Sequence, residues 1–388
     1  MKHTDVLVIG GGAIGSSAAY FLRKTDSATS VTVIEPDSTY ALASTPRASG
    51  GVRRLFSLPE NIRMSQFSLD FFLRFADEMA VGDARPDIGW KPQGYLFVVP
   101  PAGVRQLEEN WRLQTSLGVD VELLDRAALK RRFPSLHADD LGAAAFSPGD
   151  GWLDPNAVLQ GFRRKARSLG ADYVADRVIG LDVQGTAVRA ARLASGEAIH
   201  AGAVINAAGA WAAEICAMAD MPLPVEPMRR FDHYFECRVE IEPLPFIKDL
   251  DRLAMRPEGR GYTAGLVNYA EPRGFDLDID HGYFERVVWP AAAHRVPAFE
   301  TIKPGQTWAG LYDQNELDAN MILGSWPRRL DNFFVAAGFS GHGLMHAPAV
   351  GRALSELVFR GRFETLDLGR MGYGRVIANR PYAERGVI

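Results

Sequence analysis

Cysteine is scarce in this sequence. The 388 residues include only Cys216 and Cys237, with no CxxC pair. With so few cysteines we expect no disulfide framework, and a reducing compartment fits. Acidic and basic residues nearly balance, with a formal net charge of -4, so no basic stripe favours nucleic acid as a partner.

Long hydrophobic runs and targeting signals are missing as well. No apolar stretch is long enough to span a bilayer, so we expect no transmembrane segment. The first residues, MKHTDVLVIGGG, run directly into a strand-like segment without the pattern of a signal peptide. Internal repeats and low-complexity tracts are also absent. These features predict a cytoplasmic globular protein, and 47% hydrophobic residues provide for a large core.

The N-terminal segment carries a dinucleotide-binding pattern. The apolar run at 6–9 predicts a buried parallel strand, and Gly10, Gly12 and Gly15 follow it as GxGxxG at the start of a helical pattern. In such a turn the glycines allow a tight bend, a close approach to a pyrophosphate and close packing of the helix. Glu35 ends the next predicted strand and is placed to accept hydrogen bonds from a ribose. The acid favours FAD or NAD over NADP.

The rest of the chain does not continue in regular strand–helix alternation. Helical and strand patterns alternate with a proline-rich and aromatic-rich stretch from 225 to about 300. The sequence therefore predicts an α/β (α+β) fold, in which a Rossmann-like FAD-binding domain is interleaved with a second domain built on a mostly antiparallel sheet. The predicted segments are 1–80, 150–225 and 325–368 for the first domain, 81–149 and 226–324 for the substrate domain, and 369–388 for a C-terminal tail.

A glycine-rich loop, GFSGHGLMHAP at 338–348, lies between an apolar strand pattern and a helical one. Glycine in such excess indicates positive φ angles or close approach of the backbone to a ligand. His342 and His346 have the i,i+4 spacing of a metal pair, but no third ligand stands out near them, so we expect no metal here.

Four motifs together resemble the D-amino-acid oxidase superfamily of FAD enzymes, the group that includes sarcosine oxidase, glycine oxidase and dimethylglycine dehydrogenase. They are VLVIGGGAIGSSAAYFL, ASTPRASGGVRR, VINAAGAWAAE and FVAAGFSGHGLMHAPAVGRALSEL. The resemblance implies FAD held between two domains. The residues that it implies for cofactor binding are Gly10, Gly12, Ala13, Ile14, Gly15, Glu35, Pro36, Ser44, Thr45, Arg47, Ala48, Ser49, Gly50, Val178, Ala208, Gly209, Trp211, Gly310, Gly338, Gly341, His342, Gly343, Leu344 and Met345.

The family's covalent attachment residues are missing from this chain. The Cys-x-Tyr element of sarcosine oxidases reads Gly310-Leu311-Tyr312, and the TWHAAG element of dimethylglycine dehydrogenases reads TPRASG at 45–50. We therefore expect FAD to be bound non-covalently.

The resemblance also implies residues for the substrate pocket. Arg53 aligns with an arginine that pairs with a substrate carboxylate, and solvated surface is the alternative for this side chain. Tyr262, Tyr312 and His342 are further catalytic candidates, and Met345 stands where relatives carry a carboxylate-binding lysine. The oxygen-activating lysine of the family aligns with Thr263. The sequence thus predicts a pocket that has lost two cations.

The function that the resemblance implies is FAD-dependent oxidation of the C–N bond of a secondary or N-substituted amino acid. Sarcosine, dimethylglycine and iminodiacetate types fit, with hydride transfer to flavin N5 and hydrolysis of the imine. O2 or another electron acceptor completes the reaction. Oxidation of glycine or D-amino acids is an alternative. A flavin-binding assembly factor with little catalysis is another, because family members include a protein linked to assembly of a respiratory complex. The sequence leaves the oligomeric state open.

Overall fold

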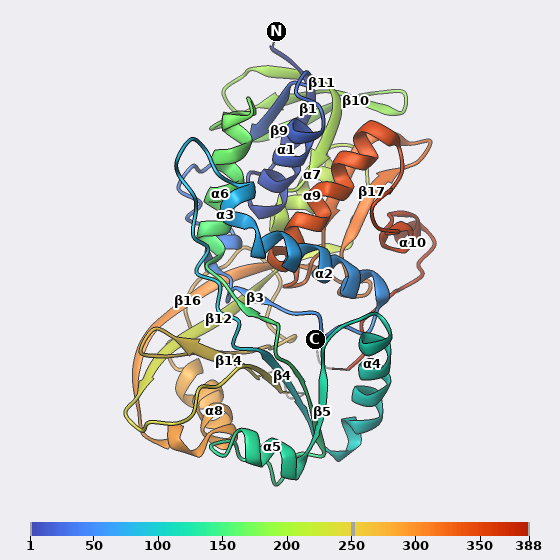
Figure 1. Cartoon of the computed structure of the whole chain (residues 1–388). Helices are drawn as coiled ribbons and strands as arrows, with labels where there is room; N and C mark the ends of the chain where they lie inside the picture. The colour runs from blue at the N-terminus through green and yellow to red at the C-terminus, as the bar shows by residue number, and fades with distance from the viewer. Residues whose placement is uncertain (1, 250–252, 387–388) are drawn as a thin grey trace.

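The computed structural model describes residues 2–249 and 253–386, and within them the chain forms two eight-stranded sheets and a short two-stranded one. Figure 1 shows the two large sheets in two halves of an elongated molecule. The first half is the one that contains β1, and the N-terminus lies at its outer end. Each sheet takes strands from segments far apart in the sequence, so the halves are interleaved. This architecture confirms the predicted fold class. The segment boundaries proposed from the sequence stay a prediction.

The first sheet is largely parallel, in the order β17-β18-β11-β1-β2-β8, with β9 and β10 attached as a hairpin beside β11. Parallel pairing joins β1 to β11 and β2, β2 to β8, and β11 to β18. Its strands are β1 (Lys2–Ile9), β2 (Val31–Ile34), β8 (Asp172–Val174), β9 (Val178–Gln184), β10 (Ala187–Leu193), β11 (Ala198–Asn206), β17 (Ile322–Trp326) and β18 (Leu330–Ala337).

Both faces of the first sheet are covered, which explains the apolar run at 6–9 in its central strand β1. In β1, Val6 and Val8 join a core shared with helices, while Leu7 and Ile9 join a second core on the opposite face. The helices of the first core, seen beside the sheet in Figure 1, are α1 (Ala13–Thr25), α2 (Pro59–Leu73), α3 (Phe75–Glu78), α6 (Pro155–Ser168) and α9 (Gly343–Arg360). The helices that complete the second face are α7 (Ala212–Ala217) and α10 (Gly374–Ile377).

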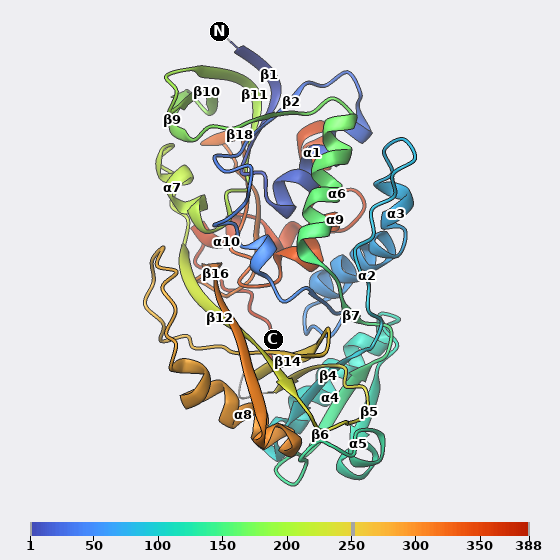
Figure 2. The same ribbon diagram turned by 90° about the vertical axis from the view of Figure 1, so that its left-hand side faces the viewer.

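The second sheet has the order β16-β12-β15-β14-β13-β4-β6-β5 and is antiparallel except between β13 and β4. Figure 2 shows its two longest strands, β12 and β16, running side by side through the second half of the molecule. Its strands are β4 (Tyr95–Val99), β5 (Glu122–Asp125), β6 (Ala143–Ser147), β12 (Val225–Cys237), β13 (Phe246–Asp249), β14 (Leu253–Glu258), β15 (Gly261–Leu266) and β16 (Ile302–Asn315).

The pleat of the second sheet separates a packed face from a face that points to the first half. Ile247 and Leu96 pack under α5 (Arg126–Arg132) and α8 (Trp289–Arg295). Phe246 and Tyr95 point the other way and stack on each other at a ring distance of 4.4 Å. The remaining elements are α4 (Val104–Ser116) and the short pair β3 (Gly51–Val52) and β7 (Gly151–Trp152). No helix in the described part of the chain has the length and apolar character of a membrane span.

Candidate active site

A cavity of about 910 Å³ lies between the two sheets and is lined from both. It runs from the GxGxxG turn past the loop at 338–343 to the face of the second sheet. Almost all residues expected at the site line it. The exceptions are Gly15, Tyr262 and Gly338.

The nucleotide end of the cavity is built around the start of α1. Gly12 is the N-cap of this helix and offers no side chain to its free N–H groups, which leaves the helix N-terminus open to an anion. The carboxylate of Glu35 accepts from Gly11 N at 2.9 Å and from Asp37 N at 3.1 Å. These bonds fix the carboxylate beside the turn, and burial raises its pKa.

Gly15 supports this end of the cavity without lining it. A Cβ on Gly15 would lie 1.9 Å from the carbonyl oxygen of Gly10, so only glycine lets the first helical turn pack against the strand end. The residue therefore shapes the turn through packing.

The loop at 338–343 is fixed by a carboxylate from β16. Asp313 accepts from Gly338 N at 2.8 Å and from Phe339 N at 3.1 Å, and burial raises its pKa to about 6. Gly341 has φ +99°, and a Cβ there would lie 2.6 Å from the Tyr312 ring. The loop thus packs closely on Tyr312 and presents the N-terminus of α9 to the cavity, while Gly338 serves as an anchor.

His342 and Arg53 form a buried pair across the cavity wall. Arg53 Nη2 lies 3.1 Å from His342 Nε2. Because a guanidinium only donates, His342 Nε2 accepts and the proton of the neutral ring lies on Nδ1. Burial, together with the charge of Arg53, holds the pKa of His342 well below its ordinary value. His342 Nδ1 is buried without a partner among the described residues, so it is a donor available to a bound group. His346 instead contacts Ser65 Oγ at 3.0 Å and does not line the cavity.

The substrate end of the cavity is more cationic than the sequence predicted. Arg230 on β12 and Lys248 on β13 both line it, in addition to Arg53. The expectation of a pocket that had lost two cations is therefore wrong. Thr263, where the family's lysine was sought, is buried and does not line the cavity. Burial, with the charges of Arg53 and Arg230, lowers the pKa of Lys248 to about 7.

The remaining candidates divide between the cavity and the core. Tyr312 and Met345 line the cavity. Tyr262 does not, because it points to the packed face of the second sheet, where its ring lies 4.6 Å from that of Phe299 and 5.8 Å from that of Phe235. Nothing in the strand pattern around residue 262 distinguished these two faces.

The residues of the cavity fit FAD. The open N-terminus of α1 and the Glu35 carboxylate suit the diphosphate and ribose of the nucleotide. The unpartnered His342 Nδ1 and the N-terminus of α9 suit the flavin ring, where negative charge accumulates on reduction. The residues expected to hold FAD, apart from Gly15 and Gly338, thus surround one continuous space.

Acid precipitation tests the expected non-covalent attachment. Cys216 and Cys237 lie outside the cavity lining, and Gly310 and Arg47 stand where relatives carry attachment residues. We expect acid-precipitated protein to release all its flavin to the supernatant. Flavin that stays in the washed pellet would contradict non-covalent binding.

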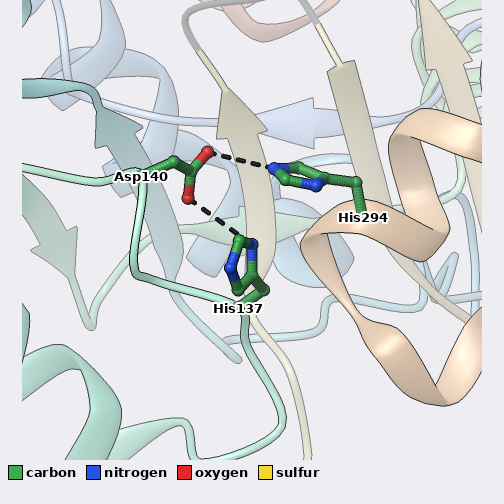
Figure 3. Close-up of side chains that lie close together, drawn as sticks. All are labelled: His137, Asp140 and His294. Carbon is green, nitrogen blue, oxygen red and sulfur yellow. Dashed lines mark hydrogen bonds and ion pairs between the residues drawn. The ribbon is translucent and has the colours of Figure 1, made fainter.

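A cluster of potential metal ligands lies outside the cavity lining. His137, Asp140 and His294 bring three ligand atoms within 4.8 Å of one another (Figure 3). Arg295 already donates to both oxygens of Asp140, at 3.0 and 2.9 Å. A cation would have to displace a guanidinium there, so the cluster is better described as an ion-pair network that ties α8 to the loop after α5.

Fold and cavity define a flavin-dependent oxidoreductase, and the comparisons with known proteins specify the family. Residues 5–357 match the family described as "FAD dependent oxidoreductase" (DAO), so the chain belongs to that family and uses FAD. It is an oxidoreductase of the kind that acts on amino compounds.

Individual relatives cover nearly all or all of the chain. The sequence is 36% identical to FAD-dependent oxidoreductase domain-containing protein 1 of Xenopus laevis, covering 100% of this chain and 85% of that protein. It is 26% identical to the mitochondrial sarcosine dehydrogenase of Mus musculus, covering 93% of this chain and 40% of that protein. The crystal structure of L-proline dehydrogenase from P. horikoshii matches with a TM-score of 0.88 at 27% identity, covering 98% of this chain and 100% of the other.

Proposed function

We propose that the protein oxidises the C–N bond of a secondary or N-substituted amino acid. The observation that carries this proposal is the chamber at the substrate end of the cavity. There, aromatic rings and guanidinium groups with unpartnered donors lie beside the loop expected to contact the flavin. Two relatives are named for sarcosine and L-proline, which are both secondary amino acids.

The chamber offers binding and orientation. Arg53 and Arg230 supply positive charge for a carboxylate, and Tyr95, Phe246 and Tyr312 supply apolar walls that exclude water. FAD, when bound, supplies the two-electron acceptor. A substrate fixed at its carboxylate has few orientations left, which is how such a site lowers the barrier without covalent chemistry.

No strong base in the chamber is needed for the reaction. Asp232 is engaged by Ser49 Oγ at 2.6 Å, and burial raises its pKa. His342 is neutral with Nε2 already accepting from Arg53. The substrate would therefore react as the neutral amine: its C–H bond gives up a hydride to the two-electron acceptor that FAD would supply, which leaves an iminium ion, and a secondary amine then releases its N–H proton to water to become an imine. Water then adds to the C=N bond and releases an amine and an aldehyde or oxo acid.

The electron acceptor in the proposal is O2 or another oxidant. Lys248 gives the chamber an ammonium group with a pKa of about 7, and a nearby positive charge stabilises reduced oxygen. We also propose a reducing, cytoplasmic location, which the free thiols Cys216 and Cys237 fit.

A flavin-binding assembly factor with little catalysis is the alternative. Burial lowers the pKa of Arg53, so the fold keeps a guanidinium where its charge is disfavoured. A carboxylate bound in the chamber would offset that cost, which supports the proposed oxidation over the alternative.

Product analysis tests the proposed reaction. We expect the holoprotein, given sarcosine and an artificial electron acceptor, to form glycine and formaldehyde in equal amounts as the acceptor is reduced. Glycine and D-alanine serve as comparison substrates for the alternative oxidation of primary amino acids. Faster turnover of these two than of every N-substituted amino acid would contradict the proposal.

A further inference from the structure

Two arginines at the substrate end have no acidic partner in the part of the chain that the structure describes. Among the ion pairs of residues 2–249 and 253–386, Arg53 and Arg230 take part in none. The neighbouring Arg229 shows the usual arrangement, because it pairs with Glu271 and Asp276. Of these two neighbouring arginines, Arg230 lines the cavity and has no ion pair among the described residues, whereas Arg229 is paired.

The guanidinium of Arg230 is held so that one edge stays available. Its Nη1 donates to the carbonyl oxygen of Asn268 at 3.0 Å. Its Cζ lies 4.9 Å from the centre of the Tyr312 ring and 5.2 Å from that of Tyr269. Nε and Nη2 are buried without a hydrogen-bond partner among the described residues. These two atoms form the edge that binds a carboxylate through two parallel hydrogen bonds.

Arg53 occupies a different place and offers a single donor. Its Nη1 donates to Leu55 O at 2.6 Å, its Nη2 to His342, and its Cζ lies 4.0 Å from the centre of the Phe56 ring. Within residues 2–249 and 253–386, its Nε alone is left buried without a hydrogen-bond partner. Its contacts differ from those of Arg230, and both side chains line the same cavity.

Two further charged groups complete the chamber. Lys248 is close enough to both arginines for their charges to lower its pKa. Asp232 is the acidic group that partly offsets the three cations, and its carboxylate accepts from Ser49. A ligand with two carboxylates would supply the acidic partners that Arg53 and Arg230 lack among the described residues.

We infer that the substrate carries two carboxylates, one bound by the Nε and Nη2 edge of Arg230 and the other placed near Nε of Arg53 and the Lys248 ammonium. The chemical class is a secondary amine that joins two carboxylate-bearing arms, of which iminodiacetate is the smallest member. This inference rests on the proposed oxidation of N-substituted amino acids and names its substrate class.

The test compares a diacid with a matched monoacid on the holoprotein. Iminodiacetate and sarcosine share the N-methylene-carboxylate unit and differ by the second carboxylate. We expect kcat/KM for flavin reduction to be about 30-fold or more higher for iminodiacetate, because a charged two-point contact contributes on that scale. The unreactive pair thiodiglycolate and (methylthio)acetate should show the same order of affinity in titrations of the flavin spectrum.

Arg230 variants test whether Arg230 binds the additional carboxylate that distinguishes iminodiacetate from sarcosine. In Arg230→Met we expect the preference for iminodiacetate to fall to within about 3-fold of sarcosine, and Arg230→Lys to restore part of it, because lysine keeps the charge but loses the two-donor edge. Flavin content and thermal unfolding of each variant report whether it folds. Arg105→Met, on the exposed side of α4, is the matched control and should keep the full preference.

The outcomes separate this inference from the proposed function. Equal or better use of sarcosine by the unchanged protein overturns the dicarboxylate substrate and leaves the oxidation of N-substituted amino acids standing. A preference for iminodiacetate that survives in Arg230→Met overturns the role of Arg230. Flavin that no amine of either class reduces overturns the proposed function itself.

Discussion

Gly12→Ala is expected to leave the fold intact and to weaken FAD binding by at least about 100-fold, which corresponds to about 3 kcal/mol. In the chain itself, a Cβ at this position would meet only Thr45 Oγ1, at an ordinary contact distance of 3.7 Å. Its φ of -62° is open to any residue. The glycine is therefore required by the cofactor, whose diphosphate has to approach the backbone closely.

Gly15→Ala is the matched control for Gly12→Ala. Its Cβ would lie 1.9 Å from Gly10 O, so this variant should lose stability in the apoprotein as well. Thermal unfolding of the two apoproteins and titration with FAD distinguish the effects. A Gly12→Ala protein that binds FAD with unchanged affinity would contradict the placement of the diphosphate.

Arg53→Met is expected to lower the rate of flavin reduction by N-substituted amino acids about 100-fold while FAD stays bound. The substitution removes a positive charge at the carboxylate end of the chamber, where a charge-assisted contact contributes about 2–3 kcal/mol. It also removes the charge that helps to hold down the pKa of His342, so that pKa should rise.

The stability of Arg53→Met should change little. Removing a fully buried guanidinium relieves its desolvation, while Leu55 O and His342 Nε2 lose their donor. The opposing contributions leave a net change within about 2 kcal/mol of unfolding free energy. Anaerobic reduction kinetics and urea unfolding measure the two effects. A variant that is reduced as fast as the unchanged protein would rule out Arg53 as a substrate-binding residue.

The parts of the site that are local in sequence were predictable. The turn at Gly10 to Gly15 lies between a strand and a helix, and Glu35 directly follows the adjacent strand β2, so their spacing in the sequence predicts that they lie together. The glycines of the loop at 338–343 indicated a binding loop. This loop follows β18, which runs parallel to β11, so it lies at the same end of the sheet as the turn after β1.

The substrate end depends on pairings that sequence spacing does not reveal. Lys248 lines the cavity together with Phe246, two residues before it in β13, and β13 pairs with β4, which lies far away in the chain. Arg230 and Arg229 are adjacent in β12, yet one lines the cavity and the other is neutralised by carboxylates. Tyr262 was expected at the cavity and lies on the packed face instead. In each case the face of a strand decides the role, and a one-residue shift reverses it.

Anaerobic addition of N-substituted amino acids to the holoprotein tests the central claim most directly. The account predicts that at least one member of a panel spanning sarcosine, N,N-dimethylglycine, L-proline and iminodiacetate bleaches the visible flavin absorbance, with iminodiacetate fastest. A flavin that none of these compounds bleaches, although light and a sacrificial donor still reduce it, would contradict the assignment of the protein as an amine-oxidising flavoenzyme.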